Sequence, residues 1–205
     1  GIHAPEFAFE KDVASVAKKV RELGLTYPVA IDNNFAQWRA FQNRYWPAHY
    51  LIDAQGKIRH RAFGEGDYEE SERAIQEVLG EQDGRSASQG FVRVQARGAQ
   101  AASSEQADQS PETYLGASRA QNQISMPHVV VDREQRYEIQ RAPARDEWGL
   151  VGSWTVRSEY AATSKAGARI VFRFKARDVH LVLGTDKAAG NAVRFRVKLN
   201  GEALG

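Results

Sequence analysis

A polar stretch in the middle of the chain, residues 83–110, most limits what these residues can fold into. It is rich in Gly, Ser, Gln and Ala, and its large apolar side chains are Phe91, Val92 and Val94. So few apolar groups cannot offset the entropy that a chain loses on ordering. We therefore expect a linker with one short docked piece around Phe91, between separate domains at residues 1–82 and 111–205.

The composition supports a buried core in each part and excludes several classes of protein. Of the 205 residues, 42% are hydrophobic and 10% aromatic, which is enough apolar material to form cores. The net charge is only +2, divided as −3 over residues 1–82 and +5 over residues 111–205. A chain with so small a net charge lacks the positive electrostatic potential that attracts nucleic acid or anionic membranes, so we expect no nucleic-acid partner.

The chain contains no cysteine, which is its strongest chemical restriction. Disulfide staples, thiolate metal sites and cysteine nucleophiles are all excluded within these residues. The five histidines show no zinc-ligand spacing, so we expect no metal and no cofactor. No apolar run approaches the roughly 20 residues that cross a bilayer, and the first residues do not resemble a signal peptide, so we expect a soluble chain.

The first segment mixes helical and strand periodicity. Apolar residues at helical spacing over 11–23, followed by Gly24, predict a capped amphipathic helix that packs on one side. The remaining patterns predict a strand at 27–31, a helix at 35–45, a hairpin of 49–53 with 57–63, and a helix at 67–79 whose inward side chains are Ala74, Ile75, Val78 and Leu79.

The second segment alternates apolar and polar residues and has almost no helical period. The alternation predicts strands at 154–160, 168–174, 179–183 and 192–199. Short strands separated by turn residues are typical of a β-sandwich. Asn200-Gly201 is a hairpin signal with only four residues beyond it, so we expect a truncated sandwich.

Four ordered motifs carry a family resemblance over Gly1 to about Leu79. They lie at 3–11 (HAPEFAFEK), 27–33 (YPVAIDN), 43–48 (NRYWPA) and 63–68 (FGEGDY). Together they resemble the TlpA-type thioredoxin domain of DipZ-like cytochrome c biogenesis proteins. This redoxin family also carries a β-sandwich similar to a carbohydrate-binding module, and residues 110–116 and 150–154 resemble its opening and an early strand.

The resemblance implies an α/β thioredoxin-like fold without its first strand and active-site helix, followed by a truncated all-β sandwich. In the family, Cys-x-x-Cys begins that helix, where the helix dipole lowers the thiol pKa. The resemblance would place this helix before Gly1, so we expect a C-terminal fragment that cannot exchange a disulfide by itself. Without the first strand and helix we also expect poor stability in isolation, or replacement of these elements by another chain.

Trp46 and Pro47 are the best candidates for substrate-binding residues. The family places a cis proline between a helix and the following strand, facing the active cysteines, and the backbone before that proline pairs with substrate. The alternatives are a trans turn proline and a core tryptophan. Glu6 and Phe7 lie near the active side in the family; their alternative roles are a loop acid and a core aromatic.

Aromatic residues of the second segment are candidates for sugar stacking. Trp148 and Trp154, with Tyr114, Tyr137 and Tyr160, supply rings on which a pyranose face could pack. The alternative is that the residues set in an alternating strand belong to the core, because similarity to a carbohydrate-binding module does not establish sugar binding.

Two functions remain open from the sequence. The first is part of a periplasmic or other extracytoplasmic thiol-disulfide oxidoreductase that acts on protein thiols and disulfides. Its electrons would come from a membrane-embedded domain that tethers the parent protein; whether residues 1–205 alone form an enzyme stays undecided. The second is a non-catalytic binding protein, with a degenerate thioredoxin scaffold and a sandwich that recognises a glycan or a cell-envelope partner.

Overall fold

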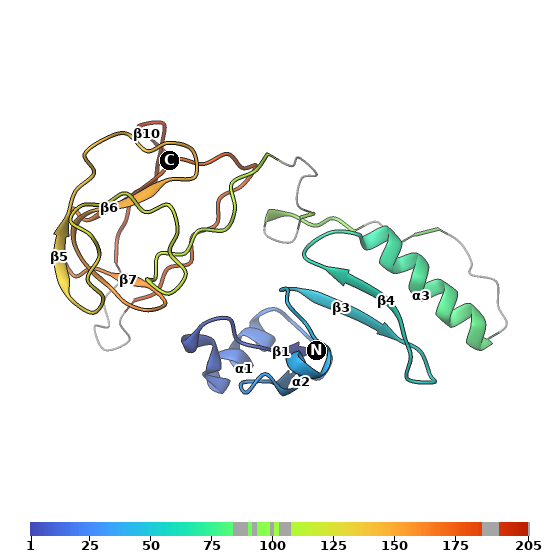
Figure 1. Ribbon diagram of the computed structural model, residues 1–205. Coiled ribbons are helices and arrows are strands. Elements are labelled where there is room, and N and C mark those ends of the chain that lie inside the picture. Colours follow the sequence, from blue (N-terminus) through green and yellow to red (C-terminus); the bar gives the residue numbers. More distant parts are fainter. Residues whose placement is uncertain (84–89, 92–93, 99–100, 103–107, 186–192, 205) are drawn as a thin grey trace.

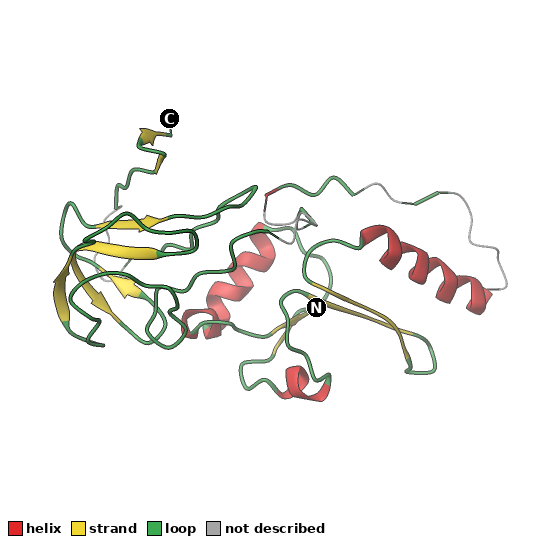
Figure 2. Ribbon diagram, turned by 45° about the horizontal axis from the view of Figure 1, so that its top comes forward, coloured by secondary structure: helices red, strands yellow, loops and turns green. Residues whose placement is uncertain are grey.

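The computed structural model describes residues 1–83, 90–91, 94–98, 101–102, 108–185 and 193–204. The three α-helices of the described residues all lie within 1–83, and the strands between residues 134 and 172 gather in a separate β-rich body (Figures 1 and 2). We call residues 1–83 the N-terminal half and residues 108–204 the C-terminal half.

The N-terminal half has the predicted order of helix, strand, helix, hairpin and helix, preceded by one short strand. Its elements are β1 (Ile2–His3), η1 (Ala8–Lys11), α1 (Val13–Glu22), β2 (Ala30–Ile31), α2 (Ala36–Ala40), β3 (Ala48–Ile52), β4 (Ile58–Phe63) and α3 (Tyr68–Asp83). The helix α1 begins where the Asp12 carboxylate accepts the Ala14 N–H and ends before Gly24, whose φ of +65° suits a glycine.

The helices bury less than the sequence predicts. No residue of α1 is buried, and Val78 is the buried hydrophobic residue of α3, while Ile75 and Leu79 are exposed. The helix α2 covers only five residues of the predicted 35–45, because Phe35 and Gln42 on either side of it adopt positive φ angles. The amphipathic pattern is therefore present, but the described structure offers few surfaces to cover its apolar side.

The strands of the N-terminal half form two separate ladders. The parallel pair β1–β2 matches Ile2 with Ala30, and the antiparallel hairpin β3–β4 matches Ala48 with Phe63. The hairpin turn is closed by the Asp53 carboxylate, which accepts the N–H groups of Gln55 and Lys57. Within the described residues no strand joins the two ladders, so β1 and β3 each keep one unpaired edge.

The C-terminal half is built around one long strand. The strand β6 (Trp148–Val156) pairs with β5 (Glu134–Tyr137), β7 (Ala161–Ala162) and β8 (Arg169–Phe172), always antiparallel. Inward residues of β6, together with Tyr137 of β5, form the core cluster: Tyr137, Trp148, Leu150, Trp154 and Val156. This cluster holds most of the fully buried apolar side chains in the described chain.

The predicted strands of this half are confirmed in part. The strand predicted at 168–174 is present as β8, over Arg169–Phe172. The strand predicted at 154–160 corresponds to β6, which begins earlier, at Trp148, and ends at Val156, so residues 157–160 lie outside it. Asn200-Gly201 connects β9 (Lys198–Leu199) to β10 (Glu202–Ala203), so the hairpin prediction is confirmed. Residues 179–183 form no strand, and Val182 is 73% exposed. Of the strand predicted at 192–199, Ala192 lies outside the described residues, residues 193–197 form no strand, and only Lys198–Leu199 is present, as β9. The sandwich stays a prediction.

The predicted linker is described only in short pieces. Phe91 lies with its ring 5.3 Å from the Arg73 guanidinium, and Gly90 accepts a hydrogen bond from Gln76, which is the docked piece expected around Phe91. Near its end, Asp108 forms ion pairs with Arg145 and Lys175 of the C-terminal half. Residues 84–89, 92–93, 99–100 and 103–107, including Val92, lie outside the described residues.

Candidate functional site

The connection from α2 to β3 carries the first predicted site. The Trp46–Pro47 peptide bond is cis, as the sequence analysis expected. The Trp46 side chain is 45% exposed, and its indole N–H donates to the Ala4 carbonyl at 3.0 Å. Its ring lies 4.1 Å from that of Trp38, so Trp38 packs against it and limits its rotation.

The main chain at Trp46 is available for pairing. The Pro47 carbonyl accepts the Gly64 N–H at 2.9 Å, which extends the β3–β4 ladder by one bond. The main-chain N–H and C=O of Trp46 have no hydrogen-bond partner within the described part of the chain. An exposed residue with both main-chain groups free can accept an extended peptide as an added strand.

The loop of residues 4–7 connects Trp46 to the other candidate residues, Glu6 and Phe7. Pro5, in the middle of this loop, is fully buried. The Glu10 carboxylate accepts the N–H groups of Glu6 at 2.6 Å and Phe7 at 3.2 Å, which fixes the loop against η1. The Glu6 side chain then points away from η1, toward the C-terminal half.

Glu6 and Phe7 contact the C-terminal half through one cluster, which we call the Glu6 cluster: Glu6, Phe7, Tyr114 and Arg119. The Glu6 carboxylate accepts the Tyr114 hydroxyl and the Arg119 guanidinium, each at 2.9 Å. The guanidinium also lies 3.7 Å from the Tyr114 ring and 5.0 Å from the Phe7 ring. Glu6 therefore lies in a contact between the two halves, with 25% of its side chain exposed.

Burial and two neighbouring carboxylates keep Tyr114 protonated. Burial, followed by the hydrogen bonds to Glu112 and Glu6, raises the pKa of the Tyr114 hydroxyl above its ordinary value. The Glu112 carboxylate lies 2.7 Å from the same hydroxyl, so the single hydroxyl proton of Tyr114 is shared between Glu6 and Glu112. Ionisation of Tyr114 would place three negative charges together beside one arginine.

A second contact between the halves lies one residue beyond Phe7. The Ala8 N–H, at the start of η1, donates to the Glu159 carboxylate at 2.9 Å. Glu159 reaches this position because its backbone passes directly over Gly116. The two segments are joined beside this point, since the Ala117 N–H donates to the Arg157 carbonyl at 2.8 Å. No periodicity or motif in the sequence relates Arg119 and Glu159 to residues 6–8, so their contacts with Glu6 and Ala8 were not predicted.

The predicted sugar-stacking tryptophans are core residues. Trp148 is 1% exposed and Trp154 is 7% exposed. Their indole N–H groups donate to the Gln121 and Val151 carbonyls, so both polar atoms are satisfied inside the fold. A buried ring offers no face to a pyranose, which corrects the stacking prediction for Trp148 and Trp154; the core alternative is the one observed.

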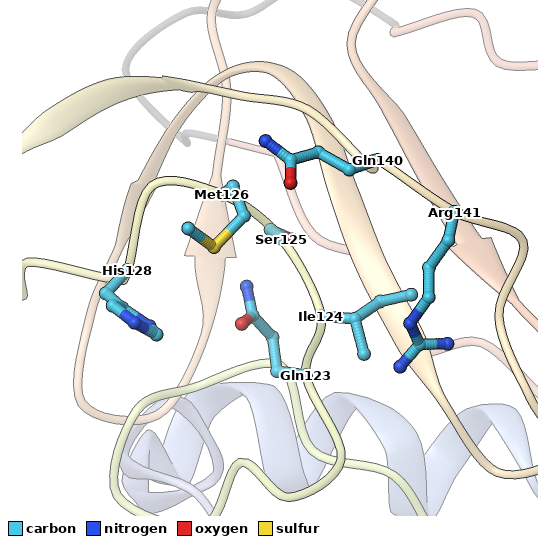
Figure 3. A pocket seen from close by; sticks show the side chains of 7 residues that line it. All are labelled: Gln123, Ile124, Ser125, Met126, His128, Gln140 and Arg141. Carbon is cyan, nitrogen blue, oxygen red and sulfur yellow. The ribbon is translucent and has the colours of Figure 1, made fainter.

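A separate pocket opens on the C-terminal half, with a volume of about 470 Å³ (Figure 3). Its lining residues are Gln123, Ile124, Ser125, Met126, His128, Gln140 and Arg141. The Gln123 amide nitrogen is buried and has no hydrogen-bond partner within the described residues. Arg141 is already bound by both oxygens of Glu147, at 2.5 and 2.6 Å, so it adds little free charge.

The His, Asp and Glu side chains of the described residues form no cluster of three that would hold a metal ion. None of the helices in the described part of the chain has both the length and the apolar character needed to cross a membrane.

Comparison with known proteins gives matches to both halves. Residues 110–205 match the family described as "Thioredoxin like C-terminal domain". The chain is 35% identical over 185 residues, 90% of its length, to Protein DipZ of Mycobacterium bovis and of Mycobacterium tuberculosis. It is 30% identical over 80 residues, 39% of its length, to Thiol-disulfide oxidoreductase YkuV of Bacillus subtilis.

The chain spans only part of these relatives: 26% of each DipZ protein and 54% of YkuV. The match to YkuV covers the length expected of one small domain, and the matches to DipZ extend through both halves and the segment between them. Residues 110–205 thus match a thioredoxin-like C-terminal domain, and the chain is similar to DipZ proteins and to a thiol-disulfide oxidoreductase.

Proposed function

We propose that these residues are part of an extracytoplasmic thiol-disulfide oxidoreductase of the DipZ, cytochrome c biogenesis type. In this proposal the N-terminal half binds protein substrates, and the C-terminal half is an appended β-sandwich similar to a carbohydrate-binding module. The whole protein is tethered to a membrane, where another of its domains supplies electrons. The chain of 205 residues has no cysteine and is inactive alone.

The main chain of Trp46 is the observation that carries the proposal. Trp46 precedes Pro47, the residue is 45% exposed, and its main-chain N–H and C=O have no hydrogen-bond partner within the described residues. A substrate segment in extended conformation gains two main-chain hydrogen bonds there without displacing any existing pair. The chain is also 30% identical over 80 residues to a protein named thiol-disulfide oxidoreductase.

The two separate ladders also support the proposal. One added strand between the free edges of β1 and β3 would join them into a single sheet, as the thioredoxin-like fold requires. In the proposal, this strand and the helix with Cys-x-x-Cys belong to parts of the protein outside these 205 residues. The same addition would cover apolar side chains that are exposed beside the ladders, such as Ile31, Ile52 and Phe63.

The chemistry follows from thiol-disulfide exchange. The first cysteine thiolate attacks one sulfur of a substrate disulfide, a mixed disulfide forms, and the other substrate sulfur leaves as a thiolate. The second cysteine then attacks the mixed disulfide, so the enzyme becomes oxidised and the substrate carries two thiols. Trp46 and Pro47 hold the substrate chain in register during both steps.

The test is disulfide exchange by a longer protein that contains residues 1–205 and the preceding Cys-x-x-Cys. We expect Pro47→Ala to raise KM for a protein disulfide about tenfold, equivalent to about 1.4 kcal/mol of binding, with a small aromatic disulfide affected much less. Pro143→Ala is the control, because Pro143 lies between β5 and β6, outside the Glu6 cluster, and alanine retains the carbonyl that accepts the Arg173 guanidinium. Absence of exchange activity in the unchanged longer protein would overturn the proposal.

The pocket favours a second candidate, in which the C-terminal half binds a neutral, hydroxyl-rich ligand such as an oligosaccharide. Two amides and an imidazole line it, and the Gln123 amide lacks an acceptor among the described residues. Titration with neutral oligosaccharides should shift the Gln123 and Gln140 side-chain resonances, and Gln123→Ala should abolish the shifts. Gln55→Ala, in the β3–β4 turn, is the control; unshifted spectra at high sugar concentration would rule out this candidate.

A further inference from the structure

We propose that the C-terminal half positions Trp46: the Glu6 cluster holds the loop of residues 4–7, and that loop holds the Trp46 indole. The inference rests on the proposed function, because it concerns how the substrate-binding tryptophan is presented. It assigns to Glu6, Tyr114 and Arg119 the role of positioning residues, which act on substrate only through Trp46.

Several interactions together hold Glu6 against the C-terminal half. An ion pair as exposed as Glu6–Arg119, with side chains 25% and 40% exposed, contributes little to stability by itself. Here the same guanidinium also stacks on the Tyr114 ring at 3.7 Å, and the same carboxylate accepts the Tyr114 hydroxyl. The ion pair, the stacking of Arg119 on Tyr114 and the Tyr114 hydrogen bond together fix both the orientation of the Glu6 carboxylate and its distance from Arg119.

A second attachment prevents rotation about the first. Glu159 accepts the Ala8 N–H at 2.9 Å, two residues along the chain from Glu6. Between these points the Phe7 ring lies 6.3 Å from the Tyr114 ring. Two polar contacts on either side of an aromatic contact hold residues 6–8 against the C-terminal half as a unit.

The last step runs from Glu6 to Trp46. Pro5 connects Glu6 to Ala4; it is fully buried, and its ring fixes its own φ angle. The Ala4 carbonyl therefore follows the position of Glu6, and this carbonyl accepts the Trp46 indole N–H at 3.0 Å. If the Glu6 cluster opens, the loop loses its outer support and the indole loses a fixed acceptor.

The first measurement is the distance between the halves in the chain as it is. Because the chain contains no cysteine, Lys18→Cys and Lys165→Cys give two unique positions for spin labels. We expect a narrow distance distribution that Arg119→Ala broadens and Arg119→Lys partly restores. The matched control is Arg157→Ala, which breaks an exposed ion pair with Asp132 inside the C-terminal half and should leave the distribution narrow.

The second measurement is the indole N–H resonance of Trp46, identified by its loss in Trp46→Phe. In Arg119→Ala we expect this resonance to shift and its hydrogen exchange to become at least about tenfold faster, the equivalent of about 1.4 kcal/mol of opening free energy. The Trp148 and Trp154 indole resonances should stay unchanged, because both groups bond inside the core and report that the variant is folded.

The outcomes separate this inference from the proposed function. An unchanged Trp46 resonance in a folded Arg119→Ala variant overturns the positioning role, as does a broad distance distribution in the unsubstituted chain. Neither result depends on disulfide exchange by the protein. Conversely, a longer protein without disulfide-exchange activity would overturn the proposed function while the Trp46 and distance measurements could still support the coupling.

Discussion

The backbone of Glu159 passes so close to Gly116 that a β-carbon on Gly116 would lie 2.2 Å from the Glu159 carbonyl carbon. The obstruction is main chain, which cannot rotate aside as a flexible side chain can. We expect Gly116→Ala to destabilise the C-terminal half by about 1–3 kcal/mol, as overpacking commonly does. It should also speed hydrogen exchange at the Ala8 N–H, the partner of Glu159.

Gly184→Ala is the matched control for this substitution. A β-carbon there would meet no atom within 4 Å, so urea unfolding of the variant should follow that of the unsubstituted chain. Equal stability of Gly116→Ala and Gly184→Ala would show that the Glu159 backbone moves aside at little cost.

Leu150 tests the core of the C-terminal half. Its side chain is completely buried among Tyr137, Trp148 and Trp154. Leu150→Ala should lower the free energy of unfolding by about 2–5 kcal/mol, because it leaves a cavity that rigid neighbours cannot fill. Leu181→Ala, at a residue that is 53% exposed, should change it by less than about 0.5 kcal/mol. A large loss at Leu181 would instead indicate that residues 179–183 pack into a second sheet.

The predicted pH dependence rests on Glu147. Hydrogen bonds from the Arg141 guanidinium, and then from the Ala144 N–H, lower the pKa of the Glu147 carboxyl to about 2. A carboxyl whose pKa falls on folding stabilises the fold above its ordinary pKa of 4.5, and this contribution disappears as the pH falls from there toward 2. Glu147→Gln should therefore be less stable than the unsubstituted chain at pH 7, with the difference vanishing near pH 2.

Urea unfolding at a series of pH values measures this effect. Glu134→Gln serves as the control, because Glu134 is exposed and its side chain has no bonding partner in the described structure. A difference between Glu147→Gln and the unsubstituted chain that stays constant down to pH 2 would contradict the pKa argument.

Asp32 links the fold to the candidate site. Its buried carboxylate accepts the Gln37 N–H at 3.1 Å and the Trp38 N–H at 2.9 Å. Burial alone raises the pKa of Asp32, but these backbone N–H groups outweigh it and hold the pKa below its ordinary value. Asp32→Ala should loosen α2 and separate the Trp38 and Trp46 rings, seen as loss of coupled-tryptophan circular dichroism. Asp32→Asn, which keeps one acceptor, should retain part of that signal.

Local patterns in the sequence predict local structure in this protein. The Asp53–Gly56 turn, the Gly24 helix end and the Asn200-Gly201 hairpin all follow from residues a few positions apart. The cis bond at Pro47 was expected from the family resemblance, since the Trp46-Pro47 dipeptide alone does not predict it. The Glu6 cluster could not be predicted, because its hydrogen bonds join residues 108 and 113 positions apart, and nothing local marks such pairs. The exposure of α1 was not predicted, because an amphipathic pattern predicts an apolar face but does not show which element covers it.

The uneven burial of the two halves has a thermodynamic consequence. In the described residues, Ala62 and Val78 are the buried hydrophobic side chains of the N-terminal half, whereas five large ones form the core of the other. On warming, the amide hydrogens of β1 to β4 should exchange with solvent well before those of β6. The C-terminal half should therefore stay folded at temperatures where the sheet ladders of the N-terminal half have opened. At those temperatures, residues 4–8 stay ordered only through their contacts with the C-terminal half.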